Sequence, residues 1–265
     1  MAIRPLRPDT AAIGWRWAIV GSLIGIALAT ATFAPARWLA SSLSDWSNGK
    51  LQLVNARGTV WNGSAGVVFS SGGGGAESIS LPGLLSWQLR PRWTGAAGAL
   101  DIPCCATQPL AFKATPRADG LRIDWQDGQS RWPAALLSGF GAPWNTLKPE
   151  GVLELTTQAW SIQWDGPRLV MAGRATLDAT DMSSSLSTLR PMGSYRLTLD
   201  GGPAPTLLLT TREGSLQLSG SGRWNGQSFR FDGEASAAAG REEALSNLLN
   251  IIGRRNGARS LITLG

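Results

Sequence analysis

Residues 216–233 read LQLSGSGRWNGQSFRFDG, and their pattern indicates the fold class most clearly. Apolar side chains at Leu216 and Leu218 alternate with polar ones, and the same period of two returns at Phe229 and Phe231. The intervening residues 224–226 read Trp-Asn-Gly, and Asn-Gly tolerates the positive φ angles that a type I′ turn requires. The stretch therefore predicts an antiparallel hairpin with one apolar and one polar face.

The same pattern recurs upstream. Asn-Gly or Asp-Gly follows a tryptophan again at residues 61–63 and 164–166, and a looser version stands at residues 125–128. We expect hairpin turns at these places, although their irregular spacing argues against a solenoid repeat. The predicted fold is therefore mainly β, with serial antiparallel hairpins forming a twisted sheet that is covered on one face. The apolar positions expected on that face are Trp160, Ile162, Trp164, Tyr195, Leu197, Phe229 and Phe231.

An uncharged segment precedes the β-rich region. Residues 17–34 read WAIVGSLIGIALATATFA and, as a helix, would span about 27 Å, close to the ~30 Å of a bilayer core. Arg4, Arg7 and Arg16 come before it, which favours a cytoplasmic N-terminus. We expect a cytoplasmic tail at 1–16 and a single-pass inner-membrane anchor at 17–34, with everything after it periplasmic. A cleaved signal peptide is the alternative.

Two shorter helices are expected around the sheet. Residues 35–48 form a linker helix, because Trp38, Leu39, Leu43 and Trp46 have helical spacing, and Asn48-Gly49 ends it. The β-rich periplasmic domain then covers residues 49–265. Residues 129–149 break the strand alternation, which suggests two β halves that meet near residue 147.

The second of these helices lies near the C-terminus. Its apolar positions 245, 248, 249 and 252 share one face, and Glu242-Glu243 precede them. Arg254-Arg255 are expected at its end, where cations suit the helix dipole, and Asn256-Gly257 are expected to stop it. We expect this amphipathic helix to cap the open end of the sheet; a partner-binding helix is the alternative.

The chemistry of most enzymes is missing from the sequence. There is no histidine, which removes Ser-His-Asp and Cys-His arrangements, and the three lysines stand in loop-like contexts without a serine partner. The basic residues form no stripe of the kind that follows phosphates, so we expect no nucleic-acid partner. We therefore predict no catalytic, cofactor-binding or metal-binding residues.

The two cysteines, Cys104 and Cys105, are adjacent. Neighbouring cysteines close only a strained ring with each other, and a zinc site would need further ligands. We expect two small residues in a loop before Pro109. A vicinal disulfide or an intermolecular bond is the alternative.

Three places in the sequence resemble protein N of the type II secretion system. The first is the apolar N-terminal segment followed by LxxAxGTVWNGSA at residues 53–65, and the second is PMGSYRL at residues 191–197. The third joins the hairpin of residues 216–240 to EAL at 243–245 and NLLNIIGRR at 247–255. Residues 70–150 match weakly.

The resemblance implies a non-enzymatic accessory component of the inner membrane. It would support export of folded proteins from the periplasm across the outer membrane, in contact with other inner-membrane components such as protein M and with the secretin. The alternative is a periplasmic groove that binds or transfers lipid, which an open apolar face would favour. A C-terminal helix covering that face would favour the scaffold.

Overall fold

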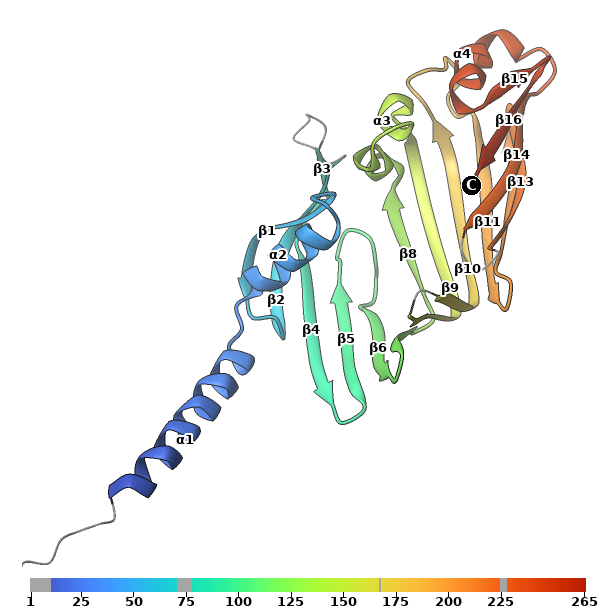
Figure 1. The fold of residues 1–265 in the computed structure, drawn as a ribbon. Helices are drawn as coiled ribbons and strands as arrows, with labels where there is room; N and C mark the ends of the chain where they lie inside the picture. Colours follow the sequence, from blue (N-terminus) through green and yellow to red (C-terminus); the bar gives the residue numbers. More distant parts are fainter. Residues whose placement is uncertain (1–10, 71–77, 167, 225–227) are drawn as a thin grey trace, which may run out of the picture.

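The computed structural model describes residues 11–70, 78–166, 168–224 and 228–265. Most of this part of the chain is a single antiparallel sheet that the chain builds strand by strand from one edge to the other (Figure 1). The strands are β1 (Leu51–Gly58), β2 (Asn62–Ser70), β3 (Ser78–Ser80), β4 (Leu85–Arg92), β5 (Gly95–Asp101), β6 (Leu110–Arg117), β7 (Gly120–Trp125), β8 (Gly128–Pro133), β9 (Glu150–Asp165), β10 (Arg168–Ser183), β11 (Gly193–Gly202), β12 (Thr206–Gly214), β13 (Leu216–Trp224), β14 (Phe229–Ala237), β15 (Arg254–Asn256) and β16 (Arg259–Leu264).

Each strand pairs with its neighbours in the chain except around β3, β8 and β15. The order runs β1-β2-β4-β5-β6-β7-β9-β10-β11-β12-β13-β14-β16-β15, while β3 adds to β2 and β8 adds to β9. The predicted mainly β fold of serial antiparallel hairpins is confirmed. Hydrogen bonding continues from β7 and β8 through β9 to β10, on both sides of residue 147. A division into two halves at that residue stays a prediction.

The predicted turns meet different outcomes. Asp165 pairs with Arg168, and Gly166 between them has φ of +57°, so the turn at 164–166 is confirmed. The turn at 61–63 is wrong, because Gly58 pairs with Gly63 and the chain reverses at residues 59–62. The Thr59 hydroxyl moves the turn, since it accepts a hydrogen bond from the Asn62 N–H (3.1 Å). Residues 225–226 lie outside the described residues.

The turn expected at residues 125–128 does not exist either. β7 and β8 pair with successive parts of the same strand, β9, so the chain continues in one direction across residues 126–127. The Asp127 carboxylate accepts a hydrogen bond from the Ala159 N–H, and Ala159 has φ of +48°. Residues 125–128 therefore mark the break between β7 and β8, and this break lies opposite the irregular backbone at Ala159 in β9.

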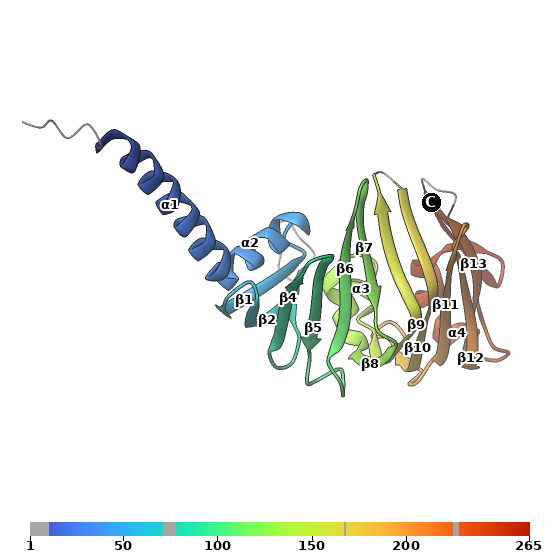
Figure 2. The same ribbon diagram turned by 90° about the horizontal axis from the view of Figure 1, so that it is seen from below.

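Two helices precede the sheet. Helix α1 (Ala11–Thr32) extends away from it, and α2 (Ala36–Trp46) packs against β1 (Figures 1 and 2). Helix α2 occupies the segment expected to form a linker helix, and both Asn48 and Gly49 take positive φ after it. No helix in the described part of the chain has the length and hydropathy needed to cross a membrane. The structure therefore does not support the anchor predicted at 17–34.

The C-terminal helix α4 (Glu242–Ile252) is confirmed, but its ending was predicted wrongly. Gly253 ends the helix, and Arg254-Arg255 belong to β15. Asn256 pairs with Arg259, so Gly257-Ala258 make the hairpin turn into β16, where Gly257 has φ of +60°. The pairing of β15 with β16 outweighs the helix dipole in placing the two arginines.

Gly63 is expected to tolerate no side chain. A Cβ at this position would lie 2.5 Å from Trp87 Cζ2 and 2.6 Å from the Arg57 carbonyl oxygen. Gly63→Ala should lower the free energy of unfolding by about 1–3 kcal/mol, measured by chemical denaturation of the full chain. Gly128→Ala is the control, because its nearest neighbour would be 3.8 Å away. Equal stabilities of the two variants would contradict the close packing of Trp87 on Gly63.

Candidate functional site

The largest functional feature is the apolar face of the sheet. The strand register places apolar side chains opposite one another on this face from β1 to β12. Such cross-strand pairs stabilise a sheet and at the same time create a surface that needs cover. The pairs include Leu53–Val67, Trp87–Leu100, Phe112–Trp125, Ile123–Ile162, Trp132–Leu153, Leu177–Leu197 and Leu197–Leu209.

The N-terminal half of this face holds an apolar cavity of about 360 Å³. Helix α2 contributes Leu39 and Leu43 to its wall, whereas Trp38 and Trp46 on the same helix are exposed. The volume lies within the range of small-molecule sites, and every lining residue is apolar. The remaining lining residues are Leu51, Leu53, Val67, Phe69, Leu81, Leu85, Trp87, Leu89, Leu100, Ile102, Phe112 and Trp132.

Trp87 shows how the cavity keeps an apolar wall. Its side chain is buried, and its Nε1–H donates to the carbonyl oxygens of Val60 (3.0 Å) and Thr59 (3.3 Å). The indole's polar atom is therefore satisfied in the β1–β2 turn, and its rings are free to face the cavity. The same turn accepts the Trp87 rings only because residue 63 is a glycine.

A short 3₁₀ helix, η1 (Ala134–Phe140), covers the middle of the face. Leu136 packs with the buried residues of the N-terminal half, whereas Ala134 and Leu137 pack with those of the C-terminal half. Trp132 contacts both groups, and its Nε1–H donates to Ser130 Oγ (2.9 Å). The two halves of the apolar face are therefore continuous.

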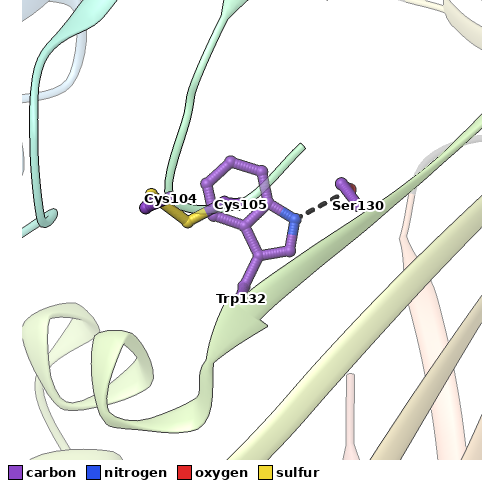
Figure 3. Close-up of a disulfide and its surroundings, with 4 residues drawn as sticks. All are labelled: Cys104, Cys105, Ser130 and Trp132. Carbon is purple, nitrogen blue, oxygen red and sulfur yellow. Dashed lines mark hydrogen bonds between the residues drawn. A yellow bond between two sulfur atoms is a disulfide. The ribbon is translucent and has the colours of Figure 1, made fainter. Parts of the chain in front are cut away.

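Cys104 and Cys105 form a vicinal disulfide beside this junction (Figure 3). The expectation of two unbonded residues in a loop is wrong, and the alternative disulfide is what the structure contains. Cys105 is buried in the cluster to which Trp132 packs, and Cys104 is exposed. The Cys105 carbonyl also accepts a hydrogen bond from the Arg131 N–H (2.6 Å), which ties the loop to β8.

Helix α4 closes the C-terminal half of the face. Leu245, Leu248 and Leu249 are almost completely buried against a cluster that includes Tyr195 and Leu216. The Tyr195 hydroxyl donates to the Leu216 carbonyl oxygen (3.1 Å), and burial raises the pKa of this phenol. This half is filled by the protein's own side chains.

The opposite face of the sheet is polar and carries ion pairs between neighbouring strands. Arg196 donates to both carboxylate oxygens of Asp178 (2.7 and 2.8 Å), and Arg212 lies 3.4 Å from the same carboxylate. The hydrogen bonds from Arg196 lower the pKa of Asp178. The polar surface predicted for one side of the sheet is present here.

The seven apolar residues predicted for the sheet face occupy several environments. Trp160, Tyr195 and Phe231 are buried, Ile162, Leu197 and Phe229 are half-buried, and Trp164 is 38% exposed. Of these seven residues, only Tyr195 belongs to the cluster beneath α4, and none lines the N-terminal cavity. Sequence reasoning missed that cavity, although the alternation of Leu85, Trp87 and Leu89 signals its wall.

Among the described residues, no group of three or more His, Cys, Asp or Glu side chains could hold a metal ion. The carboxylates of the polar face are occupied by arginines of neighbouring strands, as at Asp178 and Asp200. The predicted absence of catalytic and cofactor residues stays a prediction. The arrangement offers binding surfaces, namely an apolar cavity and the edges of the sheet.

Comparison with known proteins gives one match. The family model for type II secretion system protein N matches residues 49–262, which cover nearly the whole sheet and α4. No curated protein and no solved structure matches the chain.

The packing of α4 leads to a mutational prediction. Leu245→Ala should lower the free energy of unfolding by about 2–5 kcal/mol, because Leu245 is fully buried and the substitution leaves a cavity. Ile251→Ala on the same helix should change it little, since Ile251 is 43% exposed. Thermal denaturation of the full chain, followed by tryptophan fluorescence, measures both. Similar losses in the two variants would show that α4 does not seal the sheet as described.

Proposed function

The chain belongs to the type II secretion system protein N family, and on that premise we propose that it is a non-enzymatic scaffold of the secretion machine. It would act at the inner membrane, where it supports export of folded proteins from the periplasm across the outer membrane. The observation that carries the proposal is an open sheet whose outermost strands have no further strand beside them in the described part of the chain, because such edges bind partner strands through backbone hydrogen bonds.

The two edges of the sheet differ in how readily a further strand could pair with them. At β1, the Ser47 hydroxyl bonds to both the N–H (3.0 Å) and the carbonyl oxygen (3.1 Å) of Leu51, and a bulge follows between Val54 and Arg57. These features blunt the β1 edge. At the other edge, β15 covers β16 only up to Leu261, so Ile262–Leu264 have no strand on their outer side among the described residues. Leu264 is 61% exposed, and we expect the partner strand here.

Helix α1 supports the inner-membrane part of the proposal. Its side chains at Leu23, Ile26 and Leu28 are each more than 60% exposed, which suits an apolar environment better than water. The Ala31 carbonyl oxygen accepts a hydrogen bond from Trp61 Nε1 (2.6 Å), so the helix is fixed to the β1–β2 turn. We propose that α1 anchors a periplasmic sheet to the membrane.

The anchor is tested by membrane fractionation. Wild-type chain should keep its N-terminal residues by mass spectrometry and resist extraction from membranes with alkaline carbonate. Ile24→Arg/Leu28→Arg should release a large part of the protein, whereas Leu208→Arg, also at an exposed leucine but on the sheet, should not. A mature chain that begins after residue 29 would show that the segment is a cleaved signal.

A second candidate function is lipid binding, which the apolar cavity of about 360 Å³ favours. The cavity is roofed by α2 and is not filled by the protein's own side chains, unlike the region beneath α4. An acyl chain has the chemistry to occupy it.

In-cell photo-crosslinking distinguishes the two functions. A photoreactive residue at Leu264, on the open β16 edge, should capture inner-membrane components of the secretion machine, such as protein M, or the secretin, whereas at Val54, on the blunted β1 edge, it should capture fewer of them. The same residue at Thr210, an exposed position in the middle of the sheet, should capture far less. Capture that is equal at all three positions would contradict edge binding. Phospholipid or lipopolysaccharide co-purifying without those proteins would contradict the scaffold and support the lipid groove.

A further inference from the structure

Helix α1 leaves the sheet at one defined end. Because the strands alternate in direction, the β1–β2, β4–β5, β6–β7, β9–β10, β11–β12 and β13–β14 turns all lie at the same end. The Ala34 carbonyl oxygen accepts a hydrogen bond from the Val60 N–H (2.8 Å) in the first of these turns. Figure 1 shows α1 running away from this end, which we call the α1-side end.

Arginines flank the turns at the α1-side end. Six of them are exposed and form no ion pair with a carboxylate in the part of the chain that the structure describes, whereas Arg122 beside the β6–β7 turn is half-buried and pairs with Asp124. The carboxylates near these turns are Asp119, Asp165 and Asp200, and the last is paired with Arg174. The six exposed arginines are Arg90, Arg92, Arg117, Arg168, Arg223 and Arg230.

The opposite end of the sheet has a different charge pattern. Arg241 stands next to Glu242 and Glu243 at the start of α4, and Glu150 pairs with Arg190 (2.9 Å). Both signs are therefore mixed there, whereas cations predominate at the α1-side end. The excess of positive charge is a property of one end and not of the whole surface.

The β4–β5 turn adds an aromatic side chain to these cations. Trp93 is fully exposed at its tip, directly after Arg92. Tryptophan and arginine together suit the boundary between a bilayer and water, where the indole enters the headgroup region and the guanidinium binds phosphate.

We propose that the α1-side end of the sheet rests on a membrane surface and binds anionic phospholipid headgroups. The choice of a lipid surface follows from α1, which leaves the same end and carries exposed apolar side chains along its length. The inference deepens the proposed function and rests on its membrane placement. The cationic end would fix the orientation of the sheet, with the opposite end, α4 and the β10–β11 loop directed away from the bilayer.

The test uses the full chain and vesicles of phosphatidylcholine with or without phosphatidylglycerol. Binding is measured by co-sedimentation at low and at high salt. The wild type should prefer the anionic vesicles, and high salt should remove that preference, because added ions screen surface charges. Arg90→Gln/Arg92→Gln/Arg117→Gln should weaken binding to the anionic vesicles at least ~10-fold.

A matched variant loses the same charge at the opposite end. Arg241→Gln/Arg254→Gln/Arg255→Gln should keep the wild-type preference, and circular dichroism confirms that both variants are folded. Equal losses in the two variants, or no preference for anionic vesicles in the wild type, would overturn the proposal. Binding to vesicles of phosphatidylcholine alone that high salt does not remove would come from α1. Loss of that binding would therefore indicate failure of the anchor, whereas loss of the preference for anionic vesicles would indicate failure of the cationic end.

Discussion

A sheet that is apolar on one face must have that face covered along its whole width, and this requirement organises the molecule. Three different elements supply the cover: α2 over the first strands, η1 over the middle, and α4 over the last. The three elements differ in how completely they cover the apolar face. The leucines of α4 are buried almost completely, while α2 leaves a cavity of about 360 Å³ beneath Leu39 and Leu43. Binding capacity is therefore concentrated in the N-terminal half.

The serial antiparallel topology has a second consequence, because it sorts the connections into two groups. One end receives short hairpin turns rich in arginine, together with the departure of α1. The other receives the long connections, including η1, the disulfide loop and α4. Cover for the apolar face comes mainly from the second group. The two ends of the sheet thus have separate roles: one carries charge, and the other completes the core.

The sequence predicted those features that depend on local period. Alternation at Leu216–Leu218 and at Phe229–Phe231 indicated strands, and helical spacing indicated α2 and α4. It failed where hydrogen bonds or packing contacts that the periodicity does not reveal decide the local structure. A hydrogen bond to the Thr59 hydroxyl places the first turn at residues 59–62, and the hydrogen bond between Asp127 and Ala159 stands where a turn at 125–128 was expected. Pairing with β16 places Arg254 and Arg255 in a strand and not in the helix. The cavity was missed for the same reason, since its wall combines α2 with strands far along the chain.

Scaffold and lipid groove make different demands on the same sheet. A scaffold uses backbone groups at an edge and needs the apolar face closed, so that its core is independent of any ligand. A groove needs that face open and edges that are blunted. The structure combines a sealed C-terminal half next to the open end of β16 with an unfilled N-terminal half next to a blunted β1. Strand addition therefore belongs to the C-terminal half, and any apolar ligand belongs to the N-terminal half beneath α2.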